Sequence, residues 1–178
     1  MSAKKKLLFL CTGNSCRSQM AEGWARALKG DIFDVYSAGV ETHGLNPNAV
    51  RVMAEAGVDI SGHRSKNVSE LQNVGIDYVV TVCDHAAEVC PRFPGKAKIM
   101  HHSFQDPPAL AKTAKTEDEA LGHYRRVRDE IRAFVETLER FGFLSEDAED
   151  LEAFAERVQE PLVSYQAFLQ DLKADGRL

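Results

Sequence analysis

Apolar and polar residues alternate in blocks along the chain, and the blocks predict strands and helices in turn. Short apolar runs predict four strands, at residues 6–11, 33–38, 78–82 and 97–100. Apolar residues at helical spacing predict helices at residues 17–27, 47–56, 68–72 and 117–141. Strands that alternate with helices favour an α/β fold, in which helices flank a parallel sheet on both faces.

The second predicted helix has sequence signals at both ends. Asn46 can cap its first turn, and Pro47 suits the first helical position. Gly57 follows the last helical residue and can adopt the left-handed conformation that ends many helices. These signals predict a helix that begins at Pro47 and stops before Gly57.

The tail of the chain, residues 145–172, predicts one more amphipathic helix, which is capped by Ser145 and kinked at Pro161. Its apolar stripe consists of Leu151, Phe154, Val158, Leu162, Tyr165, Phe168, Leu169 and Leu172. The stripe either packs on the protein's own surface or forms a dimer or partner face. We therefore divide the chain into a main domain, 1–144, and a helical extension, 145–178.

Composition limits the class of protein. The chain has 178 residues, of which 44% are hydrophobic, and this suits one globular domain with its own core. It has no apolar stretch of about 18 residues and no signal-peptide pattern, so we expect a soluble cytoplasmic protein that does not enter a membrane. The net charge of −5, without a long basic stripe, makes nucleic acid an unlikely partner.

The chain contains four cysteines, at positions 11, 16, 83 and 90. Cytoplasmic thiols stay reduced, so an even number of cysteines does not predict a structural disulfide framework. Their spacings, C-x4-C and C-x6-C, differ from the tight knuckles of zinc sites, and the six histidines show no ligand spacing. We expect neither a metal nor a cofactor.

The stretch LLFLCTGNSCRS joins the first predicted strand to the first helix, with Cys11 at the end of the strand. Such a turn presents backbone N–H groups at the positive end of a helix and is suited to binding an anion. Gly13 permits unusual dihedral angles, Asn14 tolerates them, and Arg17 can bind two oxygens of a tetrahedral anion. The predicted oxyanion site comprises Thr12, Gly13, Asn14, Ser15, Cys16 and Arg17.

A cysteine in this positive environment is expected to have a lowered pKa and to be a thiolate near neutral pH. Ser18 can donate a hydrogen bond to it, so the pattern predicts that Cys11 is a nucleophile aimed at the bound anion. The alternative is a small buried cysteine beside an arginine that starts a helix. For Cys16, a backbone-donor and packing role competes with a redox role.

Two further residues extend this site. Asp106, followed by Pro107 and Pro108, is an acid on a loop stiffened by prolines and can protonate a leaving oxygen, although an Asp-Pro alone is only a turn signal. Cys83 follows the third predicted strand, as Cys11 follows the first. Because the carboxyl ends of parallel strands meet at one edge of a sheet, we expect the two cysteines to share that edge.

The motif CTGNSCRS with a late Asp-Pro resembles the low-molecular-weight tyrosine phosphatases. The longer segments CTGNSCRSQMAEGWA, YSAGVETHGLNP, VTVCDHAAEVCP, FQDPPA and YRRVRDEI resemble the thioredoxin-coupled arsenate reductases built on that fold. The resemblance covers roughly residues 6–140 and implies a four-stranded parallel sheet. Catalytic roles for Cys83 and Cys90, which the phosphatases lack, also follow from it.

The resemblance implies a relay of thiols. Cys83 attacks the arsenic adduct of Cys11, Cys90 then attacks Cys83, and thioredoxin reduces the final disulfide. A helix over residues 83–90 would separate its ends by roughly 10 Å, whereas a disulfide tolerates about 7 Å between Cα atoms. We therefore expect residues 83–91 to unwind or loop out on oxidation. Phosphate or sulfate can occupy the same loop. A phosphatase or a redox-sensing binding module remains the alternative.

Members of this family can hold a monovalent cation near the loop with an asparagine, a glutamate, a serine and a later carboxylate. Asn14, Glu22 and Ser37 match the first three, but the later loop is basic, at residues 63–66. Lys66 or Arg64 is expected to pair with Glu22 in place of the ion. Added potassium should therefore raise the catalytic efficiency little. The family often has tryptophan before the Asp-Pro, where this chain has His102.

Overall fold

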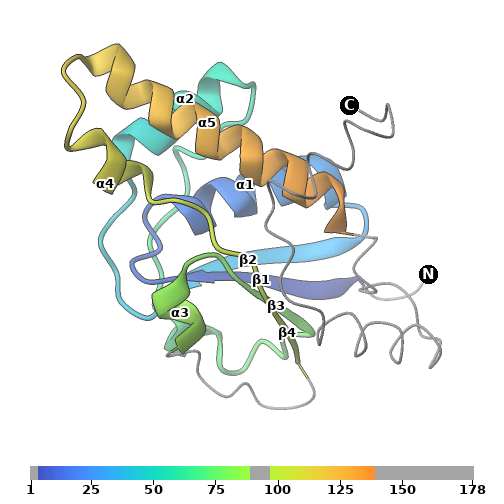
Figure 1. Ribbon diagram of the computed structural model, residues 1–178. Coiled ribbons are helices and arrows are strands. Elements are labelled where there is room, and N and C mark those ends of the chain that lie inside the picture. Colours follow the sequence, from blue (N-terminus) through green and yellow to red (C-terminus); the bar gives the residue numbers. More distant parts are fainter. Residues whose placement is uncertain (1–3, 89–96, 139–178) are drawn as a thin grey trace, which may run out of the picture. The chain divides into compact units, whose positions relative to one another are not determined.

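The computed structural model describes residues 4–88 and 97–138 (Figure 1). The chain divides into two units, Met1–Thr137 and Leu138–Leu178. All described strands and helices lie in the first unit. In order they are β1 (Lys5–Cys11), α1 (Arg17–Lys29), β2 (Phe33–Gly39), α2 (Pro47–Glu55), the 3-10 helix η1 (Val68–Leu71), β3 (Tyr78–Thr81), α3 (Asp84–Glu88), β4 (Lys98–His101), α4 (Pro107–Ala111) and α5 (Glu117–Glu136).

The four strands form one parallel sheet in the order β2-β1-β3-β4. In the register of the sheet, Cys11 lies opposite Gly39 on one side, and Leu10 lies opposite Thr81 on the other. The central strand β1 is buried from Leu7 onward, as expected for a strand that is covered on both faces. The parallel order brings the ends of β1 and β3 to the same edge, so the predicted α/β fold and the shared edge are confirmed.

Helices α1, α2 and α5 contact one another on one face of the sheet, and α3 lies away from them, next to β1 and β3 (Figure 1). Helix α5 presents an apolar stripe to this core, formed by Leu121, Tyr124, Val127, Ile131, Phe134 and Val135. From α1, Met20 and Trp24 are buried in the same layer. This packing holds the N-terminus of α1 rigidly at the end of β1.

Helix α2 has the predicted end signals. The side-chain oxygen of Asn46 accepts hydrogen bonds from the backbone N–H groups of Asn48, at 2.9 Å, and Ala49, at 3.2 Å. Pro47 is the first helical residue, and Gly57 follows the helix with a φ of 81°. Both predicted boundaries are confirmed.

Other boundaries differ from the prediction or cannot be compared with it. Pro107–Ala111 forms the short helix α4, where a proline-stiffened loop was expected; two prolines suit the first turn of a helix, because its N–H groups need no partner there. The expected helix at 117–141 is present as Glu117–Glu136. The predicted extension at 145–178, its helix and the boundary at residue 144 lie outside the described residues.

His102 occupies an aromatic cluster beside the acid loop. Its ring stacks on Phe134, with centroids 4.3 Å apart, and lies 4.7 Å from the ring of Phe104. Burial, together with the nearby charge of His101, lowers the pKa of His102 to about 4. The imidazole thus takes the place of an aromatic hydrocarbon in the packing.

Protonation of His102 is expected to destabilise the fold in weak acid. The unfolded chain, with an ordinary pKa of 6.5, binds a proton at this position before the folded chain does, at about 4. The free energy of unfolding should therefore be highest above pH 6.5 and fall as pH decreases toward 4, by on the order of 2 kcal/mol from this residue. The free energy of unfolding can be measured by urea denaturation at pH 7.5 and at pH 5. Its decrease between these two pH values should be at most half as large in His102→Phe as in the parent. His85→Asn, at an exposed position, is the control and should show the same decrease as the parent. A decrease in His102→Phe as large as in this control contradicts the prediction.

Candidate active site

The loop between β1 and α1 is hydrogen-bonded to a neighbouring segment, residues 40–46. Backbone N–H groups of this segment donate to four carbonyl oxygens of residues 11–15. The bonds run from Val40 to Cys11 (3.2 Å), Glu41 to Thr12 (2.8 Å), His43 to Gly13 (3.0 Å) and Asn46 to Ser15 (2.9 Å). Because these carbonyls turn outward, the loop can direct N–H groups toward its centre, as the Asn14 N–H does toward Cys11 Sγ at 3.1 Å. This backbone geometry is compatible with an anion at the centre of the loop, and binding of an anion there stays a prediction.

The dihedral angles of the loop differ from the expectation at one position. Asn14, not Gly13, adopts the left-handed conformation, with a φ of 46°. Gly13 is required for another reason, because a Cβ atom there would lie 2.3 Å from Nδ1 of His43. Gly39 is similarly constrained, since its Cβ would lie 2.6 Å from the carbonyl oxygen of Thr12. Close packing of the two segments thus fixes the shape of the loop.

Cys11 is buried at the centre of this loop. The Ser18 hydroxyl lies 2.8 Å from its sulfur, and the Asn14 N–H lies 3.1 Å away. Burial raises the pKa of the Cys11 thiol, and the hydrogen bonds from Ser18 and Asn14 lower it by less. The expectation of a lowered pKa is therefore wrong for this site, because the loss of hydration outweighs the donors that face the sulfur.

The orientation of the Ser18 hydroxyl follows from Asn14. The backbone N–H of Lys66 donates to Oδ1 of Asn14 at 2.7 Å, which identifies the other amide atom as nitrogen. That nitrogen donates to the oxygens of Ser18, at 2.9 Å, and Ser37, at 2.8 Å. Since Ser18 accepts this bond, its own hydrogen is available for the sulfur of Cys11, as the sequence predicts.

Arg17 connects the loop to the predicted acid. Its Nη2 lies 3.1 Å from Oδ1 of Asp106, and its Nη1 donates to the carbonyl of Phe104 at 2.9 Å. Gln105, between these residues, accepts a hydrogen bond from Arg126 of α5 at 2.6 Å. The structure thus brings Arg17 and Asp106 together, and it adds two supporting contacts that the sequence did not indicate.

Cys83 lies beside the same loop. Its sulfur is 3.4 Å from the Thr12 hydroxyl, and its side chain is buried. Helix α3 begins with the next residue, Asp84. Cys90 lies outside the described residues, so the predicted unwinding of residues 83–91 stays a prediction.

Cys16 is the last residue before α1, and its carbonyl accepts from the Met20 N–H at 2.9 Å. Its side chain is buried, and burial raises the pKa of its thiol despite the opposing effect of Arg17. Unlike Cys11, whose sulfur is faced by Ser18 and the Asn14 N–H, the Cys16 thiol has no hydrogen bond among the interactions that lower its pKa, which favours the packing role over the redox role.

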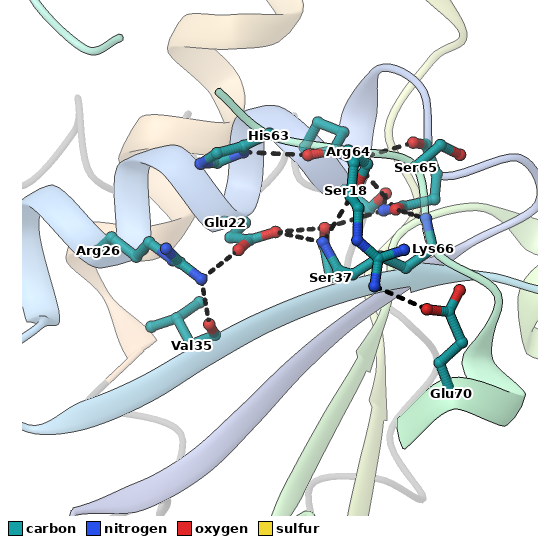
Figure 2. Close-up of polar contacts among 12 residues, drawn as sticks. Ser18, Glu22, Arg26, Val35, Ser37, His63, Arg64, Ser65, Lys66 and Glu70 are labelled. Atoms are coloured by element: carbon teal, nitrogen blue, oxygen red, sulfur yellow. Dashed lines mark hydrogen bonds and ion pairs between the residues drawn. The ribbon is translucent and has the colours of Figure 1, made fainter. Parts of the chain in front are cut away.

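A buried carboxylate, Glu22, lies behind the loop (Figure 2). It accepts a hydrogen bond from Ser37 and pairs with Arg26 at 2.6 Å and with Lys66 at 3.5 Å. Arg64 pairs instead with Glu70, at 2.7 Å. The expectation that a basic side chain of the loop pairs with Glu22 is confirmed for Lys66.

Within residues 4–88 and 97–138, no group of three or more His, Cys, Asp or Glu side chains is arranged to hold a metal ion. None of the helices described there is both long enough and apolar enough to span a membrane.

The family described as "Low molecular weight phosphotyrosine protein phosphatase" matches residues 6–147. An arsenate reductase of Halalkalibacterium halodurans is 50% identical over 139 residues, which are 78% of this chain and 98% of that protein.

Solved structures agree with this assignment. One of an arsenate reductase in the phosphate binding state is 31% identical, covers 75% of this chain and 95% of its own, and has a TM-score of 0.59. A thioredoxin-dependent arsenate reductase of Corynebacterium glutamicum is 25% identical over 78% of this chain and 64% of its own, with a TM-score of 0.56.

The chain belongs to the low molecular weight phosphotyrosine protein phosphatase family. Within this family it belongs with the arsenate reductases, to which it is about half identical along nearly their whole length.

Proposed function

We propose that this protein reduces arsenate to arsenite, with Cys11 as nucleophile, Cys83 and Cys90 as the electron-donating thiols, and thioredoxin as the final reductant. The observation that carries the proposal is the second buried thiol beside the anion loop, Cys83, at 3.4 Å from Thr12. Hydrolysis of a phosphate ester needs water to release the adduct, whereas reduction needs another thiol. Because thioredoxin-dependent thiols need a reducing compartment, we place the protein in the cytoplasm.

In the first step, arsenate binds in the loop opposite Cys11. Because burial raises the pKa of the thiol, the resting sulfur carries a proton, which the arsenate dianion can accept as sulfur attacks. An S–As bond forms and one As–O bond breaks, and Asp106 supplies the second proton, so that the oxygen leaves as water. Arg17 and the loop N–H groups balance the charge on the remaining oxygens.

In the second step, the sulfur of Cys83 attacks the sulfur of Cys11, and the proton of the Cys83 thiol passes to an oxygen of the departing arsenite. The S–As bond breaks, and its electron pair stays on arsenic, which is thereby reduced from As(V) to As(III) and leaves as arsenite. The two sulfurs are oxidised to a Cys11–Cys83 disulfide, so two electrons leave the thiols and two reach arsenic. Phosphorus(V) does not accept electrons in this way, and this difference separates two anions of nearly equal shape.

In the third step, Cys90 attacks Cys83, which releases Cys11 as a thiol and leaves a Cys83–Cys90 disulfide. A dithiol of thioredoxin then reduces this bond by exchange. The test is NADPH consumption in the presence of thioredoxin and its reductase, which should require both arsenate and the protein. Arsenite should form in equal amount to the NADPH consumed; the absence of arsenite under these conditions contradicts the proposal.

A phosphatase of small or tyrosyl phosphates is the second candidate, because the loop, Arg17 and Asp106 suit both reactions. Weak hydrolysis of an aryl phosphate is compatible with reduction, since both start with an anion opposite Cys11. Only aryl phosphate turnover that greatly exceeds arsenate turnover would favour the second candidate.

The pairing of Lys66 with Glu22 predicts that potassium has little effect on this enzyme. The ammonium group lies 3.5 Å from the buried carboxylate, where it supplies the charge that a monovalent cation would supply. In Lys66→Ala, Arg26 is the ionic partner that the carboxylate keeps among the described residues, and added potassium is expected to raise kcat/KM several-fold.

Potassium should be titrated at constant ionic strength, with sodium or choline in exchange. Arg64→Ala is a matched control, because Arg64 pairs with the exposed Glu70. Strong potassium stimulation of the unaltered protein would contradict the prediction.

A further inference from the structure

Gln19 of α1 is a fully buried amide that joins the anion loop to the segment 63–66. Its Nε2 lies 3.0 Å from the carbonyl oxygen of Asn14 and 3.0 Å from that of Arg64. Carbonyl oxygens only accept hydrogen bonds, so the atom that faces them must be the amide nitrogen. The oxygen of the Gln19 amide therefore points the other way.

That oxygen faces His63. Nδ1 of the imidazole lies 3.0 Å from Oε1 of Gln19, and an amide oxygen cannot donate, so Nδ1 must carry a hydrogen. Burial lowers the pKa of His63, and the positive charges of Arg26 and Lys66 lower it further. The negative charges of Glu22 and Asp59 raise the pKa, but by less. The ring is thus held as the neutral tautomer with its hydrogen on Nδ1.

The same orientation continues from Gln19 to the nucleophile. Nε2 of Gln19 also lies 3.0 Å from Oδ1 of Asn14, so that its two hydrogens are shared among three acceptors, and Nδ2 of Asn14 donates to Oγ of Ser18 at 2.9 Å. The Ser18 hydroxyl then lies 2.8 Å from Cys11 Sγ. Every donor in this series faces toward Cys11, from the imidazole to the sulfur.

We propose that His63 is a positioning residue for Cys11, which acts through the oriented series Gln19, Asn14 and Ser18. No proton travels along the series, since its amides neither gain nor lose one. Gln19, Asn14 and Ser18 are buried, and each hydrogen bond among them polarises the next, so the Nδ1–H group of His63 strengthens the final bond from Ser18 to the sulfur. The proposal rests on the proposed function only in taking Cys11 as the nucleophile.

Alkylation of Cys11 tests this without arsenate or thioredoxin. The rate of iodoacetamide modification of Cys11 at pH 7, followed by mass spectrometry of its peptide in the full chain, measures its nucleophilicity. His63→Leu removes the donor and should slow modification roughly threefold to tenfold. His63→Asn places an amide nitrogen where Nδ1 stood and should restore the rate to within about twofold of the parent.

His123→Asn removes an imidazole outside the series and serves as the control. A merely structural role for His63 would make both substitutions slow the reaction alike, and this outcome overturns the proposal. So does a parental rate in His63→Leu.

A second measurement does not depend on how the variants fold. Long-range ¹H–¹⁵N correlation spectra of the unaltered protein report which nitrogen of His63 carries hydrogen. The proposal requires hydrogen on Nδ1 at pH 8, and hydrogen on Nε2 overturns it. Because neither measurement involves arsenate, failure here leaves the proposed reduction standing, and failure of the NADPH assay leaves this series standing.

Discussion

Cys83→Ser is expected to abolish sustained arsenate turnover, lowering kcat by roughly a thousandfold or more. The sulfur of Cys83 lies 3.4 Å from the hydroxyl of Thr12, beside the loop that holds Cys11. A serine at this position cannot form a disulfide. The first adduct should still form, because the loop and its donors are unchanged. Quenched-flow measurement of arsenite should then show no arsenite beyond background.

Hydrolysis of an aryl phosphate provides the internal control for this variant. Cys11, Arg17 and Asp106 remain, so this weak activity should persist within about threefold of the parent. Continued arsenite production by Cys83→Ser at the parental rate would remove Cys83 from the mechanism.

The position of Cys83 shows what the sequence could predict and why. Apolar runs identified β1 and β3, and parallel strands end at one edge of a sheet, so the meeting of Cys83 with the Cys11 loop required no side-chain detail. Asp106 was identified by chemistry instead, as an acid that the anion loop would need. The structure then placed it 3.1 Å from Arg17.

What the sequence could not supply depends on tertiary packing. The sign of the pKa shift of Cys11 is a balance between burial and donors, and burial by β2, α1 and their neighbours is not visible in a motif. Gly13 is required by the ring of His43, thirty residues later in the chain. Gln19 resembled an ordinary helix residue, although its amide joins two loops.

Arg17→Lys is expected to lower kcat/KM for arsenate roughly a hundredfold, which corresponds to a loss of about 3 kcal/mol in transition-state stabilisation. The guanidinium spans from the carbonyl of Phe104, at 2.9 Å, to Asp106, at 3.1 Å, and its five N–H donors exceed the number that these two contacts use. An ammonium group is a point charge without this fork geometry, so it cannot bind the acid loop and two oxygens of the anion together. Steady-state kinetics in the NADPH-coupled assay measures the loss, and Arg132→Lys, outside the site, should change it little.

The double variant with Asp106→Asn distinguishes a binding role of Arg17 from a positioning role. If the guanidinium places Asp106 for proton donation, the loss caused by Asp106→Asn should be much smaller in the Arg17→Lys background than in the parent. Strictly additive losses would mean that the 3.1 Å contact between these side chains does not contribute to the reaction. In that case Arg17 acts on the anion alone, and Asp106 is positioned by the first turn of α4 and by the bond between Gln105 and Arg126.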